Sequence, residues 1–335
     1  MNNQESCIVA DDNGYAEHKI CFWKGEPGKS EIVEMSLPSR AAIGSQALTL
    51  EGNLSGVYEI NGTRWTVSAH VSDPENTRSG DYATSDLNTV LVNHALVLAG
   101  FSDKNVRLAT GLPYANFFDE NGIRIDYVSK VKKTIKRDVK SLGGSELANI
   151  IENNVYPEST AAWIDFSVDS ETGELIAENE NGVAVVDIGG NTTDVTYINA
   201  GSESLNRERS GTREIGVLHV RDKLKNLFKV NFEIDEVSDA QLDIALRTNK
   251  FKLFKKEHDV TELVEVAKKD VGQKVLNFVT EKVGKGTQLD YIVFVGGGAE
   301  LLHNIINTYQ HAVVPDRPQF SNARGMLKHW TFIVG

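Results

Sequence analysis

Hydrophobic positions in the first third of the chain follow the short alternating pattern that is typical of β-strands. Two apolar runs, CIVADDNG (7–14) and HKICFW (18–23), flank the pair Asn13-Gly14, which is a strong signal for a hairpin turn. Similar runs are EIVEMSLPS (31–39), GVYEING (56–62) and TRWTVSA (63–69). We therefore expect the opening third of the chain to be rich in β-structure.

Helical periodicity appears next and alternates with further strands. Residues 86–101 have the spacing of a helix, with Asp86 as a plausible cap, and residues 125–144 place an apolar stripe on one helix face before ending at Gly-Gly. Between these helices, residues 105–113 read as a strand, and NNVYPEST (153–160) reads as a strand that runs into a helix.

A polar, turn-rich segment at 169–182 is a plausible domain boundary, because the pattern restarts after it. The restart is a second hairpin, VAVVDIGGNTTDVTYINA (183–200). Helices are then expected from residue 216, over 261–283 and over 321–330, and YIVFVGGGAELL reads as strand, triple glycine and helix. Each half thus begins with a hairpin around an acidic-glycine turn. This repetition predicts a duplicated α/β protein with a ligand cleft between its halves.

The composition of the chain argues against several classes of function. A chain of 335 residues has the length of about two domains, and its net charge of −12 argues against general coating of DNA. Two cysteines do not make a disulfide framework, so free thiols in a reducing cytosol are expected. The first residues lack the features of a signal peptide, and the apolar runs are too short to cross a bilayer.

The second hairpin carries the strongest candidate chemistry, in the segment DIGGNTTD (187–194). Gly189 and Gly190 allow the backbone to approach an anion, and Thr192 and Thr193 could add hydroxyl donors. Asp187 leaves the strand beside them, where it could hold Mg²⁺ through water. An ordinary hairpin turn with polar capping residues explains the segment equally well when it is taken alone.

Two further motifs are weaker individually. In the first hairpin, DDNGYAEHK, Asp12 precedes the turn and Lys19 follows it, as a phosphate clamp would need, yet a simple hairpin is the commoner explanation. In FVGGGAELL, Gly296 to Gly298 leave a flat surface on which a purine could lie. A strand-to-helix turn that is tight for steric reasons remains the alternative.

Together, in this order, the three motifs resemble the actin-like ATPase superfamily, which includes actin, Hsp70-type chaperones and sugar kinases. The blocks GLPYANFFD, VYPEST, VVDIGGNTTDVT, VFVGGGAELL and NARGM are similar to the ParM/StbA family of plasmid-partitioning actins. The resemblance implies an actin-like α/β fold in which two ribonuclease-H-like domains flank a nucleotide cleft. It places domain I at 1–180 plus 308–335 and domain II at 181–307.

The resemblance also implies roles for individual residues. Glu158 and Asp187 would be catalytic, with Glu158 orienting or deprotonating the water that attacks the γ-phosphate. The sequence alone favours a simpler explanation of Glu158, as an acid stabilised at a helix N-terminus. Asp12 and Asp187 would hold Mg²⁺ through water. The residues expected to bind ATP or ADP are Asp12, Asn13, Gly14, Tyr15, Ala16, Lys19, Gly189, Gly190, Asn191, Thr192, Lys225, Gly296, Gly297, Gly298 and Ala299.

Several positions depart from the family pattern. Tyr15 and Ala16 stand where the family usually has Ser or Thr, so the backbone of the first turn must supply more of the phosphate contact. Asn191 replaces a more usual Thr. The stretch from 218 to 260 shows little that matches, and Lys225 is chosen there as an adenine contact although a solvated helical lysine explains it as well.

The function implied is that of a cytoplasmic ATPase whose ATP-bound form polymerises into filaments that segregate plasmid DNA. Its partners would be other copies of itself and a DNA-binding adaptor, with no direct DNA binding and no membrane. A small-molecule kinase on the same fold and a nucleotide-binding scaffold without turnover are the alternatives. The lysine-rich helix at 128–140 is explained either as a solvated helix face or as a filament contact.

Overall fold

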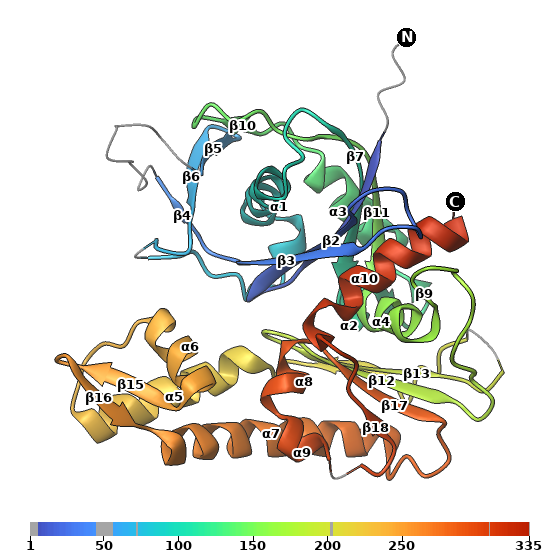
Figure 1. The fold of residues 1–335 in the computed structure, drawn as a ribbon. Coiled ribbons are helices and arrows are strands. Elements are labelled where there is room, and N and C mark those ends of the chain that lie inside the picture. Colours follow the sequence, from blue (N-terminus) through green and yellow to red (C-terminus); the bar gives the residue numbers. More distant parts are fainter. Residues whose placement is uncertain (1–5, 45–55, 72, 202–203, 308, 335) are drawn as a thin grey trace.

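Two five-stranded mixed sheets form the frame of the molecule, and they share one topology (Figure 1). The computed structural model describes residues 6–44, 56–71, 73–201, 204–307 and 309–334. In each sheet, the first strand pairs antiparallel with the second and parallel with the fourth, which pairs parallel with the fifth. The third strand pairs antiparallel with the second. The predicted duplication of an α/β unit is confirmed.

The first sheet has the order β11-β7-β1-β2-β3. Its strands are β1 (Cys7–Asn13), β2 (Glu17–Trp23), β3 (Ile32–Pro38), β7 (Asn105–Leu112) and β11 (Asn149–Pro157). Helices α1 (Asp86–Leu98) and α3 (Ile125–Ile135) bury Val92, Leu96 and Val131 against one face. Helices α4 (Glu158–Ser167) and α10 (Ser321–Lys328) cover the other face through Ala161 and Met326.

The predicted helices of this half are corrected in two places. The N-cap of α1 is Ser85, whose side chain accepts a hydrogen bond from the Asn88 N–H group, and Asp86 is the first helical residue. Helix α3 ends at Ile135 and not at the Gly-Gly pair. The chain beyond it forms the short strand β10 (Lys140–Ser141), because backbone pairing with β5 (Val57–Ile60) competes with continuation of the helix.

The second sheet has the order β14-β13-β12-β17-β18. Its strands are β12 (Val183–Ile188), β13 (Thr193–Ile198), β14 (Gly211–Arg213), β17 (Tyr291–Val295) and β18 (Ala312–Val313). Helix α7 (Thr261–Val283) spans the predicted residues and packs Val275, Phe278 and Val279 on one face. Strand β18 lies in the segment 308–335 that the sequence assigned to domain I, yet it pairs with β17 of this sheet.

Each half also carries a smaller unit on the same side of the molecule (Figure 1). The first is a four-stranded sheet formed by β4 (Ala41–Ile43), β5 (Val57–Ile60), β6 (Thr63–Val67) and β10. The second has its own core and consists of α5 (Val217–Phe232), α6 (Asp239–Thr248), β15 (Lys250–Leu253) and β16 (Lys256–Asp259). This second unit contains most of residues 218–260, the stretch in which the sequence showed little that matched the family.

The remaining short elements connect these layers. They are η1 (Tyr82–Thr84), α2 (Tyr114–Phe117), β8 (Phe118–Asp119), β9 (Gly122–Ile123), α8 (Gly297–Leu301), α9 (His303–Ile306), η2 (Pro318–Phe320) and η3 (His329–Val334). Within the described ranges, every helix is too short or too polar to cross a membrane.

Candidate functional site

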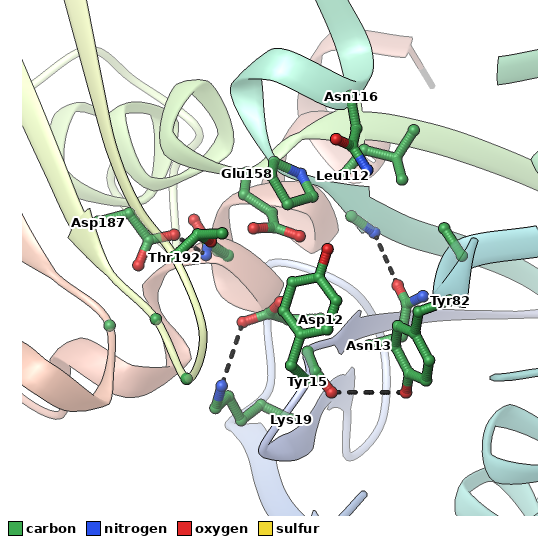
Figure 2. Close-up of a pocket in the computed structure, with 18 residues that line it drawn as sticks. Asp12, Asn13, Tyr15, Lys19, Tyr82, Leu112, Asn116, Glu158, Asp187 and Thr192 are labelled. Carbon is green, nitrogen blue, oxygen red and sulfur yellow. Dashed lines mark hydrogen bonds and ion pairs between the residues drawn. The ribbon is translucent and has the colours of Figure 1, made fainter. Parts of the chain in front are cut away.

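The two hairpin turns meet at the centre of the molecule. A Cβ atom placed on Gly190 would lie only 2.7 Å from the Cβ atom of Ala16, so the turn of the second hairpin touches the turn of the first. Beside this contact lies a cavity of about 30 Å³ that both halves line (Figure 2). Its predicted lining residues are Asp12, Asn13, Gly14, Tyr15, Lys19, Glu158, Asp187, Gly189, Gly190, Thr192 and Gly296.

Lys19 carries the positive charge of the first hairpin. It faces Asp12 across the β1–β2 pair, and the Nζ atom lies 3.6 Å from the Asp12 Oδ2 atom. Burial lowers the pKa of Lys19, but Asp12 and further carboxylates raise it more, and the net shift is upward. Lys19 is therefore a permanent cation at the cavity.

The Asn13 side chain is engaged in holding the first hairpin in place. Its amide nitrogen donates to the Asn88 side-chain oxygen at 3.1 Å, and its own oxygen accepts from the Gly111 N–H group at 3.1 Å. These bonds tie the turn to α1 and to β7. Asn13 is thus brought to the cavity, but its polar atoms already have partners within the fold.

Tyr15 occupies the cavity itself. Figure 2 shows its ring beside Asp12 with the hydroxyl directed toward Glu158. The ring centroid lies 5.4 Å from that of Tyr82, and burial together with the Glu158 carboxylate raises the pKa of the Tyr15 hydroxyl. Tyr15 also lines a neighbouring groove of about 1050 Å³, so its ring stands between the small cavity and the large groove.

Asp187 lies next to the last residue of β12 in the second half and lines the same cavity. Its Oδ2 atom accepts a 2.7 Å hydrogen bond from the side chain of Asn322 on α10. Burial and the nearby Asp12 raise the pKa of Asp187 to about 7, although the bond from Asn322 opposes the shift. Its carboxyl group therefore titrates close to neutral pH.

Glu158 is the first residue of α4 and faces Asp12, Asp187 and Asp194. Burial and these carboxylates raise its pKa well above the ordinary value, and Lys19 only partly offsets them. Glu158 lines the cavity. Its catalytic role, which the family resemblance implies, stays a prediction.

Carboxylates outnumber cations around the cavity. Asp12, Asp187 and Glu158 line the cavity with Lys19. Burial, together with repulsion from the neighbouring carboxylates, raises the pKa values of Glu158 and Asp187. A divalent cation would relieve this excess of negative charge, so the donor set suits Mg²⁺. Among the described residues, no three His, Cys, Asp or Glu side chains are close enough to hold a metal directly.

Asp194 is a site residue that the sequence analysis missed as such. Its Oδ1 atom accepts from the backbone N–H group of Tyr114, at 2.9 Å, and from the hydroxyl of Thr212, while Thr192 donates to Oδ2 at 3.3 Å. Asp194 thereby joins β13 of the second half to α2 of the first. The second acid of DIGGNTTD was the available signal, but nothing local indicates a partner 80 residues away.

The other polar residues of the second turn are all buried, but they differ in what they contact. Thr192 lines the cavity, whereas Asn191, a predicted contact, is buried but is not among the lining residues. The Thr193 hydroxyl is fully buried and donates to the Ile215 carbonyl oxygen at 2.7 Å. The carbonyl oxygens of Gly189 and Gly190 accept from the Val217 and Leu218 N–H groups. The start of α5 therefore fixes the conformation of the turn.

Two explanations were open for Gly296 to Gly298, a flat binding surface and a turn that is tight for steric reasons. Each explanation holds for some of the three glycines. A Cβ atom on Gly296 would overlap Asp187, and one on Gly298 would overlap Ile188, so close packing requires both glycines. Gly297 has open space where its Cβ would lie, as a flat binding surface needs. Ala299 is buried in the core of the second half, where its side chain cannot reach the cavity.

Lys225 lies apart from the small cavity. It lines the larger groove together with Arg221, one helical turn before it, and Lys229, one turn after it, on one face of α5. The structure thus brings Lys225 into the space between the two smaller units. Any contact with a base would have to be made there.

Gly297→Val is expected to weaken ATP and ADP binding alike, by on the order of 10-fold, or about 1.4 kcal/mol. The branched side chain would fill the open surface on which the sequence predicts that the base of either nucleotide lies. Gly297 does not have a positive φ, so the fold should tolerate the change. Fluorescence titration with both nucleotides measures the effect. Loss of ATP binding alone would instead place the glycines near the γ-phosphate.

Comparison with known proteins agrees with this architecture. A family model for the N-terminal domain of the plasmid segregation protein ParM matches residues 8–170. A model for the C-terminal domain of archaeal MreB-like actin homologues matches residues 185–308. No curated protein sequence matches the chain.

Solved structures with a similar fold cover almost the whole chain. The archaeal actin homologue Ta0583 has a TM-score of 0.76 at 20% identity, over 97% of this chain and 99% of that protein. A ParM from a 15-stranded filament of Clostridium botulinum has a TM-score of 0.74 at 19% identity, over 97% and 98%. ParM of Bacillus thuringiensis with ADP has a TM-score of 0.65 at 15% identity, over 96% and 97%.

These similarities confirm the predicted actin-like fold. The two matched segments lie in the two halves that the duplicated sheets define, and each contains one of the facing hairpins. The chain therefore has the actin-like fold, and it resembles ParM/StbA proteins in its N-terminal half and archaeal MreB-like actin homologues in its C-terminal half.

Proposed function

We propose that this protein is an ATPase that assembles into filaments with ATP bound and that disassembles after hydrolysis to ADP. The observation that carries the proposal is the pair of facing hairpin turns, which enclose Lys19 and the carboxylates Asp12, Asp187 and Glu158. Backbone N–H groups of two turns, one fixed cation and a proton-exchanging carboxyl group are what phosphate binding and hydrolysis require.

Binding of a triphosphate requires the two turns to move apart. The cavity of about 30 Å³ has room for little more than a water molecule, and the Tyr15 ring occupies its entrance from the groove. Phosphates that enter between Gly14 and Gly190 would displace this ring. The contact between Ala16 and Gly190 would then be replaced by contacts of both turns with the phosphates.

Asp12 and Asp187 would hold Mg²⁺ through water, since both carboxylates line the cavity from opposite halves. When bound, the metal ion would neutralise charge on the phosphate oxygens. Asn322 holds the Asp187 carboxylate in its orientation, and Gly296 leaves the space that this carboxylate occupies. The chain thus fixes one of the two acids before any ligand arrives.

Glu158 would orient the attacking water or accept its proton. Glu158→Gln is expected to preserve ATP binding and assembly but to slow hydrolysis by about 10²–10⁴-fold, the usual contribution of such a group. Filaments of this variant should therefore persist longer after assembly, as followed by light scattering and phosphate release. Glu152→Gln, at an exposed position on β11, serves as the control. Loss of nucleotide binding with unchanged turnover per bound ATP would make Glu158 structural.

The biological role follows from the family resemblance and from the charge of the chain. Similar structures include a ParM filament and an archaeal actin homologue in complex with ADP, which supports self-assembly and nucleotide binding here. We propose that the filaments segregate plasmid DNA in the cytoplasm. A net charge of −12 favours contact with DNA through a separate basic adaptor over direct binding.

One experiment distinguishes this function from the alternatives. Light scattering, phosphate release and ADP release are recorded after addition of ATP and Mg²⁺, with and without a panel of sugars. A filament-forming ATPase gives nucleotide-dependent scattering that does not need a sugar. Release of ADP only with a sugar would indicate a kinase, and binding without scattering or turnover would indicate a scaffold.

A further inference from the structure

The tip of the β15–β16 hairpin presents an aromatic side chain to solvent. Phe254 is 90% exposed, the largest fraction among the exposed large hydrophobic side chains of the described residues. Leu253 and Lys256 pair across the hairpin, so Phe254 and Lys255 form a two-residue turn. Their φ angles are +47° and +66°, in the left-handed region that favours glycine and asparagine in such turns. The Phe254 side chain therefore does not favour the conformation of the turn, and it does not pack against its own chain.

Positive charge surrounds this ring. Lys252, Lys255 and Lys256 are exposed, and within the described parts of the chain none of them has an acidic partner. Lys250, at the base of the hairpin, is paired with Glu257 at 2.8 Å. Residues 252–256, the basic tip, thus combine one unburied aromatic ring with three uncompensated cations on a chain that is acidic overall.

A surface of the opposite character lies in the segment between α4 and β12, residues 169–182, the acidic loop. Leu175 and Ile176 are 66% and 64% exposed in it. The segment contains no Lys or Arg, and its acidic residues are Asp169, Glu171, Glu174, Glu178 and Glu180. Backbone bonds from Asp169 to Glu174 and from Ile176 to Ser167 hold its conformation.

The two surfaces lie at opposite ends of the molecule. The β15–β16 hairpin is at one extremity in Figure 1, and the connection from α4 to β12 is at the other, on the side of the C-terminus. The position of Gly173 against Phe332 also places the acidic loop beside the C-terminal helix. Because of this separation, the basic tip and the acidic loop of one copy cannot bind each other.

We propose that the basic tip of one copy binds the acidic loop of the next, with Phe254 packed against Leu175 and Ile176. Opposite charges would steer the encounter, and burial of the exposed apolar side chains would stabilise the contact. Two different surfaces joined head to tail do not close on themselves unless the rotation between copies forms a ring, so they generate an open filament. This inference rests on the proposed filament assembly and names the surfaces that carry it.

Phe254→Asn separates assembly from folding. Asparagine suits the left-handed turn, so the thermal stability of the variant should equal or exceed that of wild type, while the protein concentration needed for ATP-dependent pelleting should rise at least 10-fold. Leu175→Ser together with Ile176→Ser should have the same effect on pelleting. Leu98→Ser, at another exposed apolar position on α1, should leave pelleting unchanged. Wild-type pelleting by the Phe254→Asn variant would overturn the proposal.

Mixing the two defective proteins tests the direction of the contact. Each lacks one surface and keeps the other, so the mixture should form dimers in analytical ultracentrifugation but no filaments. A mixture that stays monomeric at the concentration where wild type assembles would contradict the pairing.

The contact can also be tested without assembly. Wild-type protein that fails to pellet with ATP would contradict the proposed function. The contact is then examined by crosslinking mixed Phe254→Cys and Leu175→Cys proteins with a bifunctional maleimide, with wild type as the control for Cys7 and Cys21. Absence of a crosslinked dimer above that control would overturn the proposal.

Discussion

Asp187→Asn is expected to reduce ATP hydrolysis by more than about 100-fold while leaving the fold intact. The substitution keeps the shape of the side chain and an oxygen that can accept from Asn322. It removes the negative charge that would position the metal ion and the attacking water. Phosphate release under saturating ATP measures the effect. Turnover within about threefold of wild type, or under about 0.7 kcal/mol of barrier, would rule out this role.

Asp187→Asn should slow hydrolysis, but it should also increase the thermal stability of the nucleotide-free protein. Folding raises the pKa of Asp187 from 3.8 to about 7, so the folded state binds the proton more tightly than the unfolded state does. The free energy of unfolding therefore falls as pH rises from about 4 to about 7. Asp187→Asn lacks this titration and should melt at a higher temperature than wild type at pH 8.

A surface acid supplies the control for this pH dependence. Hydrogen bonds from Asn181 lower the pKa of Asp290, so its contribution to stability is present above its unfolded pKa and is lost as pH falls. Asp290→Asn should therefore not raise the melting temperature at pH 8. Equal melting curves for Asp187→Asn and wild type across pH 4–8 would mean that the ionised Asp187 carboxylate does not destabilise the free protein.

Gly325→Ala is expected to be strongly destabilising, because a Cβ atom at this position would overlap the carbonyl oxygen of Ala161. Gly325 lies where α10 crosses α4, and the obstacle is rigid helix backbone. Overpacking of this kind typically costs 1–3 kcal/mol, which should lower the melting temperature by several degrees. Gly80→Ala, where the added methyl group meets no atom within 4 Å, is the control. Equal stability of the two variants would contradict the close crossing.

The local pattern of the sequence predicted those features that local contacts determine. The first hairpin, the second hairpin and the long helix Thr261–Val283 were all readable from periodicity and turn residues. The predicted tight turn at Asn13-Gly14 is wrong, because Asn13 still pairs with His18 and the chain turns over residues 14–17. The match between the two sheets also followed, because both halves repeat the same order of strand, turn and helix. Helix α3 was predicted too long because pairing of Lys140 and Ser141 with β5 depends on a distant strand.

The site was predictable where one motif contains it and hidden where distant segments meet. The carboxylates and glycines of the two hairpins were found, but Asn322 reaches Asp187 from 135 residues away, and no pattern around NARGM indicates this bond. The same holds for the bond from the Tyr114 N–H group to Asp194. One local signal was overlooked: Ser238 and Gln241 form a capping box that marks the start of α6.

The division into two domains and the individual nucleotide contacts stay predictions. Lys225 lines a different space from the other predicted contacts, and Ala299 is part of the core, so these two positions have the weakest support. Support is greatest for Lys19, Asp187 and Glu158, because charge, position and pKa all agree there.

The central claim, that a nucleoside triphosphate between the two hairpins drives assembly, is tested most directly by negative-stain electron microscopy with a slowly hydrolysed ATP analogue and Mg²⁺. We expect filaments with the analogue and dispersed particles with ADP or without nucleotide. Dispersed particles under all three conditions, at concentrations where the analogue saturates the protein, would contradict the claim.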